Sequence, residues 1–186
     1  MKTLFINATA REDSRTLMLA DAVLENISGE IKEINLYDLK LKPFDWEMVQ
    51  RRMKLIKENK FNDEIFMLAK DFASADKIVI AAPVWDLSFP SILKVYFEHV
   101  SAAGVMFKYT ENGPKGLAKA KELIYVTTSG GNMILNYGFE YVKALATIMY
   151  GINDVKLVYA DGLDIWGADV DEIIESKIKE IEENFK

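Results

Sequence analysis

Short apolar runs alternate along this chain with longer segments whose apolar residues recur at helical spacing. The short runs are typical of buried strands, and the helical spacing is typical of amphipathic helices that pack on a sheet. The runs that predict strands are residues 2–8, 30–36, 77–82, 122–127 and 155–160. The segments that predict helices are residues 14–27, 63–74, 90–103, 137–149 and a last one that begins near residue 169.

Capping residues predict where two of these helices begin. We expect Ser88 and Pro90 to start the helix after the third strand, because serine caps a helix and proline suits its first turn. The last helix begins near Asp169, with acidic residues in its first turn. Its residues expected to point inward are Val170, Ile174, Ile178 and Ile181.

Five strands joined by crossover helices predict an α/β fold with a doubly wound parallel sheet and helices on both faces. We expect the flavodoxin-like strand order 2-1-3-4-5 rather than a six-stranded Rossmann order, because only five strands are counted. Residues 37–60 and 104–117 are less regular and lie outside the predicted elements. With no repeat or linker in 186 residues, we expect residues 1–186 to form a single domain.

The balance of residue types favours an intracellular, cytoplasmic protein. Apolar residues make up 50% of the chain and charged residues 28%, and the net charge of −6 argues against a general binder of nucleic acid or membrane surfaces. No apolar run approaches the roughly 18 residues of a membrane-spanning helix. The apolar stretch at the amino terminus is too short for a signal peptide.

The absence of cysteine and the single histidine limit the possible chemistry. The chain offers no thiolate nucleophile, no disulfide and no zinc site rich in cysteine or histidine. We expect His99 to be structural. Walker A, Gly-x-Gly-x-x-Gly and Gly-x-Ser-x-Gly motifs are also absent. If the chain is an enzyme, a bound cofactor therefore supplies the reactive group and no metal is expected.

The loop after the first strand is a candidate phosphate site. It ends in a helix start and carries hydroxyl groups at Thr9, Ser14 and Thr16 beside two arginines. Free N–H groups, the helix dipole and hydroxyl donors together favour a phosphate at such a place, although Ser14 or Asp13 as an ordinary helix cap is the alternative. Without a glycine-rich dinucleotide turn, a mononucleotide such as FMN is favoured.

Two further loops follow the third and fourth predicted strands, where a doubly wound sheet binds ligands. The first runs from Pro83 to Pro90. Trp85 follows the strand end there, which favours a site role over a place in the core. The second loop ends in Gly130 and Gly131, a pair that taken alone could form an ordinary turn.

These loops and one further segment resemble the FMN-dependent NADH:quinone oxidoreductase and azoreductase family, within the flavodoxin-like NAD(P)H-dependent reductases. The most specific match is Phe107-Lys108-Tyr109-Thr110-Glu111-Asn112-Gly113-Pro114. The resemblance covers most of residues 1–131 and implies a homodimer with FMN sites near the subunit interface. It also implies ping-pong transfer of two electrons from NADH or NADPH to a quinone, azo or nitro compound.

The resemblance also implies roles for individual residues. Tyr109 falls near the substrate side of the flavin and is the candidate catalytic residue. The residues that fall on the phosphate loop are Thr9, Ser14, Arg15 and Thr16. Those that fall along the flavin ring are Pro83, Val84, Trp85, Asp86 and Leu87. Those that border its pyrimidine end are Thr128, Ser129, Gly130 and Gly131.

Three of these positions depart from the family pattern. Trp85 stands where the family often has tyrosine, and Ser129 stands where arginine is common. Asp86 stands where asparagine is usual, and its negative charge would repel electron-rich atoms of a flavin. These departures bear on the substrate range and the flavin potential.

Two other classes of protein stay open as alternatives. One is a flavodoxin-like, non-enzymatic electron carrier, which the segment 109–114 argues against. The other is a flavin-free interaction module, which the hydroxyl-rich first loop argues against. The pair Arg51 and Arg52 is expected to be a solvated or interface charge pair, with binding of a nicotinamide phosphate as the alternative.

Overall fold

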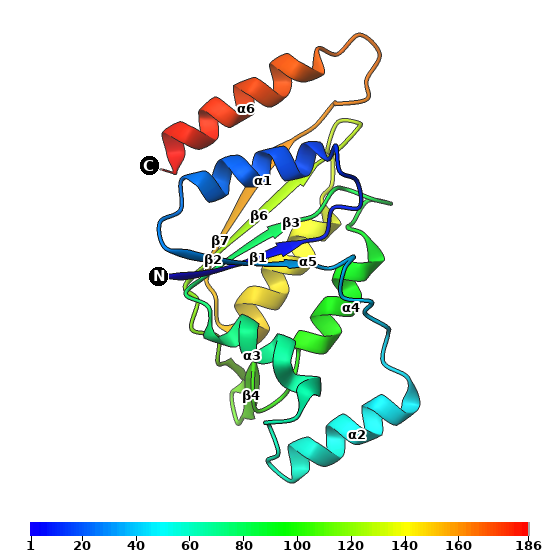
Figure 1. The fold of residues 1–186 in the computed structure, drawn as a ribbon, viewed down its shortest axis with the longest axis vertical. Helices are drawn as coiled ribbons and strands as arrows, with labels where there is room; N and C mark the ends of the chain where they lie inside the picture. The colour runs from blue at the N-terminus through cyan, green and yellow to red at the C-terminus, as the bar shows by residue number, and fades with distance from the viewer. Residues whose placement is uncertain (186) are drawn as a thin grey trace.

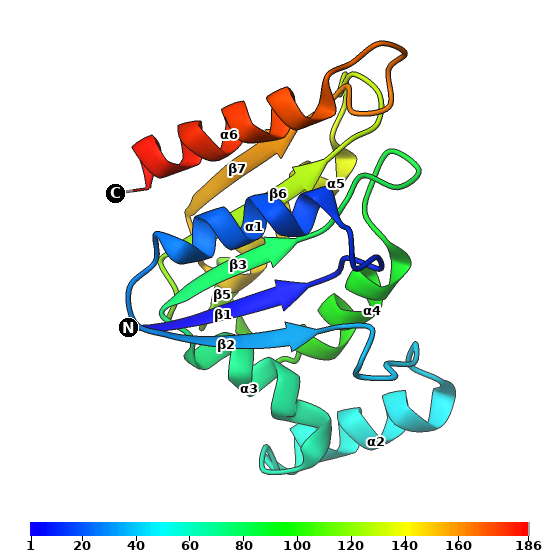
Figure 2. The same cartoon turned by 45° about the horizontal axis from the view of Figure 1, so that its top comes forward.

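Five parallel strands form the central sheet of the computed structural model, which describes residues 1–185. The strands are β1 (Lys2–Asn7), β2 (Glu30–Asn35), β3 (Lys77–Ala81), β6 (Glu122–Thr128) and β7 (Asp154–Ala160). Their order across the sheet is β2-β1-β3-β6-β7, so the predicted flavodoxin-like fold and its order 2-1-3-4-5 are confirmed. The arrows of β1, β3, β6 and β7 point toward the same edge of the molecule (Figure 2).

Helices cover both faces of the sheet (Figure 1). One face carries α1 (Arg15–Glu25) and α6 (Val170–Asn184). The other face carries α3 (Met67–Ser74), α4 (Ser91–Val100) and α5 (Tyr137–Ala144). The sheet therefore separates two apolar clusters, as a doubly wound fold requires. None of the helices described combines the length and the apolarity needed to cross a membrane.

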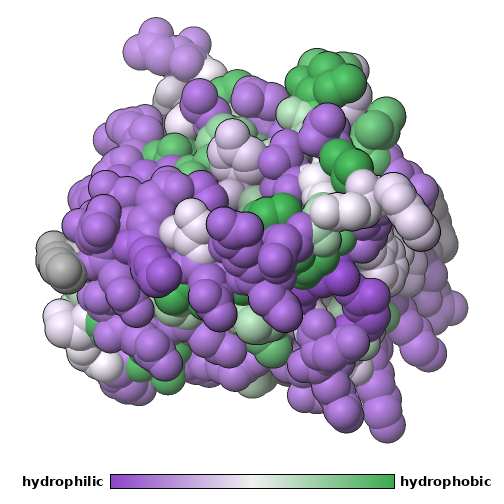
Figure 3. Space-filling view, turned by 90° about the horizontal axis from the view of Figure 1, so that it is seen from above, coloured by the Kyte–Doolittle hydropathy of each residue, from purple (hydrophilic) through white to green (hydrophobic). Residues whose placement is uncertain are grey.

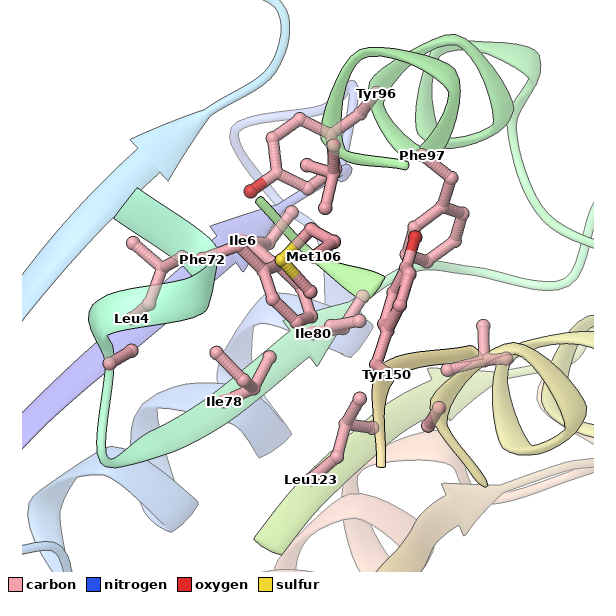
Figure 4. Packing of buried hydrophobic residues seen from close by; sticks show 14 of the residues in the cluster. Leu4, Ile6, Phe72, Ile78, Ile80, Tyr96, Phe97, Met106, Leu123 and Tyr150 are labelled. Atoms are coloured by element: carbon pink, nitrogen blue, oxygen red, sulfur yellow. The ribbon is translucent and has the colours of Figure 1, made fainter. Parts of the chain in front are cut away.

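Successive residues of each strand point to opposite faces, and this alternation fills both clusters. In β1, Leu4 and Ile6 enter the cluster beneath α3 and α4, whereas Phe5 enters the cluster beneath α1 and α6. Figure 4 shows the first cluster, in which the rings of Phe72 and Tyr150 pack edge to face with their centres 5.3 Å apart. Because both faces are buried, the central strands read as nearly continuous apolar runs.

The expectation that residues 37–60 are irregular is wrong over their second half, which forms α2 (Trp46–Lys57). Asp45 caps this helix, since its carboxylate accepts a hydrogen bond from the Met48 N–H at 2.8 Å. None of the twelve residues of α2 is buried. Its apolar residues recur at helical spacing, but its mean hydropathy is low, so the segment reads as a polar stretch in the sequence.

Residues 104–117, expected to lie outside strands and helices, contain an antiparallel hairpin. Its strands are β4 (Phe107–Thr110) and β5 (Gly113–Gly116). A Cβ atom on Gly116 would lie 2.0 Å from the Tyr150 carbonyl carbon, so only glycine allows this contact. The contacted segment, Leu145–Tyr150, is a π-helix that follows α5. The hairpin is thus packed closely on the main body of the fold.

Two predicted helix starts have different outcomes. Asp169 caps α6 as expected, and its carboxylate accepts a hydrogen bond from the Glu172 N–H at 3.1 Å. Ser88 does not begin α4, which starts at Ser91 with Pro90 at the capping position. The backbone of Ser88 instead pairs with that of Trp85, so this serine belongs to the preceding turn.

Candidate functional site

The loops that follow β1, β3, β6 and β7 all lie at the carboxyl edge of the sheet, because the strands are parallel. From β1 the chain passes to β2 on one side, and β3 lies on the other side of β1. Such a reversal of strand order is where doubly wound sheets bind ligands. The predicted phosphate, flavin-ring and pyrimidine loops therefore share one edge.

The loop after β1 ends at a helix start whose hydroxyl groups are buried. The Ser14 hydroxyl caps α1 and accepts a hydrogen bond from the Leu17 N–H at 3.3 Å. The Thr9 N–H and hydroxyl both donate to Asn7 Oδ1, at 3.0 and 2.7 Å. The first N–H groups of α1, at Arg15 and Thr16, have no acceptor within the helix. The cap predicted as the alternative is real, and it leaves these donors available for an anion.

Thr128, the last residue of β6, joins the three loops. Its hydroxyl oxygen lies 2.6 Å from that of Thr16, and both side chains are buried. Its carbonyl accepts a hydrogen bond from the Val84 N–H at 2.9 Å. Residues that are distant in the sequence are therefore held side by side, as the site prediction requires.

A tight two-residue turn follows β3. The backbone N–H and C=O groups of Trp85 and Ser88 bond to each other at 3.1 and 2.8 Å. Between them, Asp86 has φ 49° and Leu87 has φ 66°, in the left-handed region that residues with a Cβ rarely adopt. Trp85 is 46% exposed and Leu87 62%, so the indole is not a core residue. The turn presents two apolar side chains to solvent at the carboxyl edge.

The hydroxyl group of Tyr125 lies near the end of this turn. A Cβ atom on Gly138 would lie 3.1 Å from the Tyr125 hydroxyl and 3.2 Å from the Ser88 carbonyl carbon, which places these groups around one small space. Burial raises the pKa of Tyr125 far above its ordinary value. The phenol therefore stays protonated in the folded protein.

Three successive carbonyl groups of the loop after β6 are turned to one side. The C=O groups of Ser129, Gly130 and Gly131 accept hydrogen bonds from the loop after β7, at 3.2, 2.8 and 3.1 Å. In a trans peptide the N–H points opposite to the C=O of the preceding residue. The N–H groups of Gly130, Gly131 and Asn132 therefore point away from the supporting loop. The Ser129 N–H is not among these donors, because it bonds to the Ala160 carbonyl at 3.0 Å.

The side chain of Arg15 lies against the loop after β7. Its Nη1 atom is 2.8 Å from Asp164 Oδ1 and 3.3 Å from the Leu163 carbonyl oxygen. A Cβ atom on Gly130 would lie 2.2 Å from Asp164 Oδ2. The structure thus brings the backbone of Arg15 to the phosphate loop but directs its guanidinium elsewhere.

Tyr109 lies at the opposite edge of the sheet from the three loops. Lys119, just beyond its hairpin, donates its N–H to the Ala73 carbonyl and pairs with Asp76, beside the starts of β1 and β3. Figure 1 shows β4 below α3, away from the loops. Tyr109 is 75% exposed. Within one chain, the candidate catalytic residue is not brought to the other candidate residues.

His99 and the two adjacent arginines have structural contacts. His99 Nε2 lies 2.9 Å from the Lys42 carbonyl oxygen, and its ring packs on Phe44 at 4.4 Å. The Arg52 guanidinium also stacks on Phe44, 4.1 Å from its ring centre, and donates to the Glu98 carbonyl. Arg51 pairs with Asp63 at 2.8 Å. These residues hold α2 and its flanking chain on the fold.

Residues after β7 were not predicted to belong to the site. Asp161 accepts a hydrogen bond from the Met133 N–H at 2.8 Å, and Asp164 holds Arg15. The position of this loop after the fifth strand is the one signal that could have indicated it. Its acidic residues look like ordinary surface residues in the sequence.

The donor groups at this edge fit a flavin mononucleotide. The start of α1 supplies backbone N–H groups and buried hydroxyls for a phosphate. The N–H groups of Gly130 and Gly131 suit the electron-rich pyrimidine end of a flavin, and a Cβ on Gly131 would meet no atom within 4 Å, so space is open there. The described residues of these loops include no cysteine or histidine, and the arrangement suits redox chemistry carried by a cofactor.

The fold and these loops define a flavodoxin-like protein, and the chain belongs to the flavodoxin-like fold family, whose model matches residues 1–185. It is 33% identical to an FMN-dependent NADH:quinone oxidoreductase of Coprothermobacter proteolyticus over 100% of this chain and 98% of the relative. It is 34% identical to a protein of the same name from Clostridium perfringens, over 96% of this chain and 94% of the relative.

A solved structure gives the same result. An FMN-dependent NADH-azoreductase of Bacillus anthracis in complex with FMN superposes with a TM-score of 0.83 at 28% identity, over 100% of this chain and 98% of that chain. The resemblance to this family, predicted from the loop motifs, is confirmed.

Proposed function

We propose that this protein is an FMN-dependent oxidoreductase that transfers two electrons from NADH or NADPH to a quinone, azo or nitro compound by a ping-pong mechanism. The observation that carries the proposal is the convergence of three loops around Thr128. They combine a helix start, an exposed aromatic residue and a row of N–H donors at one sheet edge. The names of the relatives support the cofactor and the reaction class.

The residues of the three loops would hold the cofactor in distinct ways. The N–H groups of Arg15 and Thr16 and the hydroxyl of Ser14 would bind the phosphate at the start of α1. The N–H groups of Gly130 and Gly131 would donate to the pyrimidine end and stabilise negative charge there. When bound, FMN supplies the two-electron chemistry, which no side chain of this chain can perform.

Apolar side chains near these loops suit aromatic substrates. Trp85 and Leu87 are exposed on their turn, and Ile165 and Trp166 are exposed on the loop after β7. Figure 3 shows hydrophobic surface gathered toward the side where the loops lie, on a face that is otherwise mostly hydrophilic. A nicotinamide and a quinone would stack in turn against the same apolar wall, and this alternation would give ping-pong kinetics.

A homodimer would complete this site. Tyr109 lies at the far edge of its own chain, so it can approach the flavin only from a second copy. The exposure of Tyr109 on a hairpin held firmly at Gly116 favours such a contact. We infer that the hairpin of each subunit reaches the flavin site of the other.

The absorbance spectrum tests the function. The purified protein should carry or take up FMN, and NADH or NADPH added without oxygen should bleach the flavin. A quinone added afterwards should restore the colour. Double-reciprocal plots at several fixed quinone concentrations should be parallel. Intersecting plots, together with a flavin that neither donor bleaches, would contradict the reductase and favour an electron carrier.

A further inference from the structure

The guanidinium of Arg15 is bound through Nη1 to the loop after β7. Arg15 is the first residue of α1, and the resemblance of the chain to the family placed this residue on the phosphate loop. Its Nη1 donates to Asp164 Oδ1 at 2.8 Å and to the Leu163 carbonyl at 3.3 Å, on the loop after β7. The Arg15 side chain is one-third exposed, and the Asp164 side chain is 71% exposed.

The loop that Arg15 contacts is the one that supports the pyrimidine-side donors. The Asp164 N–H donates to the Gly130 carbonyl at 2.8 Å, and the Leu163 N–H donates to the Ser129 carbonyl at 3.2 Å. The Asp164 carboxylate also lies where a Gly130 side chain would start, with Oδ2 2.2 Å from that point. Asp164 therefore contacts both the start of α1 and the loop after β6.

We propose that Arg15 and Asp164 form a brace that sets the position of the Gly130 and Gly131 N–H donors relative to the start of α1. The Arg15 side chain is a positioning residue, and it does not bind the phosphate of FMN. This inference rests on the proposed flavin site and goes beyond it, because Asp164 was not a predicted site residue.

The brace matters because FMN contacts two separate elements at once. Its phosphate and its pyrimidine ring are a fixed distance apart, so α1 and the 129–131 loop must be held at a matching separation. When the two elements are already held in place, little conformational entropy is lost on ligand binding. An ion pair this exposed contributes little to the free energy of unfolding. Its loss should therefore appear in flavin affinity rather than in global stability.

Titration of FMN and riboflavin against three variants tests the brace. The variants are Arg15→Gln, Asp164→Asn and the double variant. Each single change should weaken binding of both ligands by roughly fivefold to tenfold, and the double change should weaken it no further, because either change removes the same ion pair. Asp164→Asn is the decisive variant, since it keeps the charge of Arg15. Urea titration should show nearly unchanged free energies of unfolding.

Arg11→Gln is the matched control, because it removes the same charge from the same loop without touching Asp164. It should leave the affinity for riboflavin unchanged. A direct phosphate contact by Arg15 would instead weaken FMN binding alone, and Asp164→Asn would leave or improve it. Either of these results, or equal losses in Arg11→Gln, would overturn the brace. Failure of the unaltered protein to bind any flavin would overturn the proposed function as well.

Discussion

The side-chain oxygens of Thr16 and Thr128 lie 2.6 Å apart, so the first turn of α1 is hydrogen-bonded to the last residue of β6. Both residues are almost completely buried. A buried hydroxyl that loses its partner keeps its desolvation cost, whereas two hydroxyls removed together do not leave one unpaired. Loss of either hydroxyl alone should therefore destabilise the contact between the phosphate loop and the pyrimidine loop.

Thr16→Val should lower the free energy of unfolding by about 1–3 kcal/mol, because the Thr128 hydroxyl is left buried without its partner. Valine keeps the shape of threonine, so packing is unchanged. The double variant with Thr128→Val should lose less than the sum of the two single variants, as measured by urea titration. Thr16→Ser, which keeps the hydroxyl, is the control. Strictly additive losses would show that the two hydroxyls do not depend on each other.

Leu87→Gly should raise the free energy of unfolding by about 1 kcal/mol, because glycine adopts the φ of 66° without the penalty that leucine incurs. Leu87 is largely exposed, so little packing is lost. The variant should have a higher melting temperature and a lower turnover, since the turn loses its apolar side chain. A destabilised variant would indicate that the leucine is held by contacts with a second subunit.

Asp86→Asn should make flavin reduction easier. Asparagine tolerates the φ of 49° and so preserves the turn, while the substitution removes a negative charge near the proposed flavin ring. The midpoint potential, measured by dye-coupled titration, should become less negative. An unchanged potential with unchanged FMN affinity would place the carboxylate away from the ring.

Gly130→Ala and Gly131→Ala should differ in stability although the residues are adjacent. Both glycines have φ angles outside the positive range, so the backbone accepts alanine at either. The new Cβ at Gly130 would collide with Asp164, and the free energy of unfolding should fall by about 1–3 kcal/mol. At Gly131 the Cβ meets open space, and stability should stay equal or rise by up to about 1 kcal/mol. Equal losses in urea titrations would contradict the close contact with Asp164.

Light scattering should give about twice the chain mass of 21.2 kDa. Tyr109→Ala should lower kcat/KM by roughly tenfold, equivalent to about 1.4 kcal/mol, by removing a ring that the partner subunit supplies. Because Tyr109 is exposed in the single chain, the free energy of unfolding of the dissociated subunit should change by less than about 0.5 kcal/mol. Tyr109→Phe, which keeps the ring, is the control. A monomer with full activity on dilution would contradict the dimer.

Glu122 should make stability depend on pH in the acid range. Burial alone would raise its pKa, but hydrogen bonds from Lys156 and Lys77 outweigh burial and hold the pKa below its ordinary value of 4.5. The folded state therefore favours the ionised carboxylate. The stability that Glu122 contributes is present above pH 4.5 and is lost as the pH falls through the lowered pKa. Glu122→Gln should flatten this part of the unfolding profile in urea titrations at pH 3–6.

The sequence pattern was sufficient to predict the parallel sheet, because buried strands such as Lys77–Ala81 read as continuous apolar runs. The same pattern missed α2, whose residues are all at least partly exposed, and the β4–β5 hairpin, whose strands are four residues long and contain Gly113, Pro114 and Gly116. The helix was missed because its mean hydropathy is low, and the hairpin was missed because its strands are too short to show a period.

The site was predictable only as far as loop positions. The order of strands places the loops after β1, β3 and β6 together whatever their side chains do. The direction of a long side chain depends on contacts that are remote in the sequence: Arg15 and its partner Asp164 are separated by 149 positions. No local pattern could indicate that the guanidinium turns away from the predicted phosphate.

The helix α2 should open at a lower free energy than the rest of the fold. It buries no residue completely and is attached through a few contacts, such as the stacking of Arg52 on Phe44. Local opening exposes only the surface that a segment had buried, so α2 can unfold and refold while β3 stays intact. Its amide hydrogens should therefore exchange with solvent through local openings of α2 alone. Residues 46–57 would then form a separate cooperative unit, while the rest of the protein stays folded.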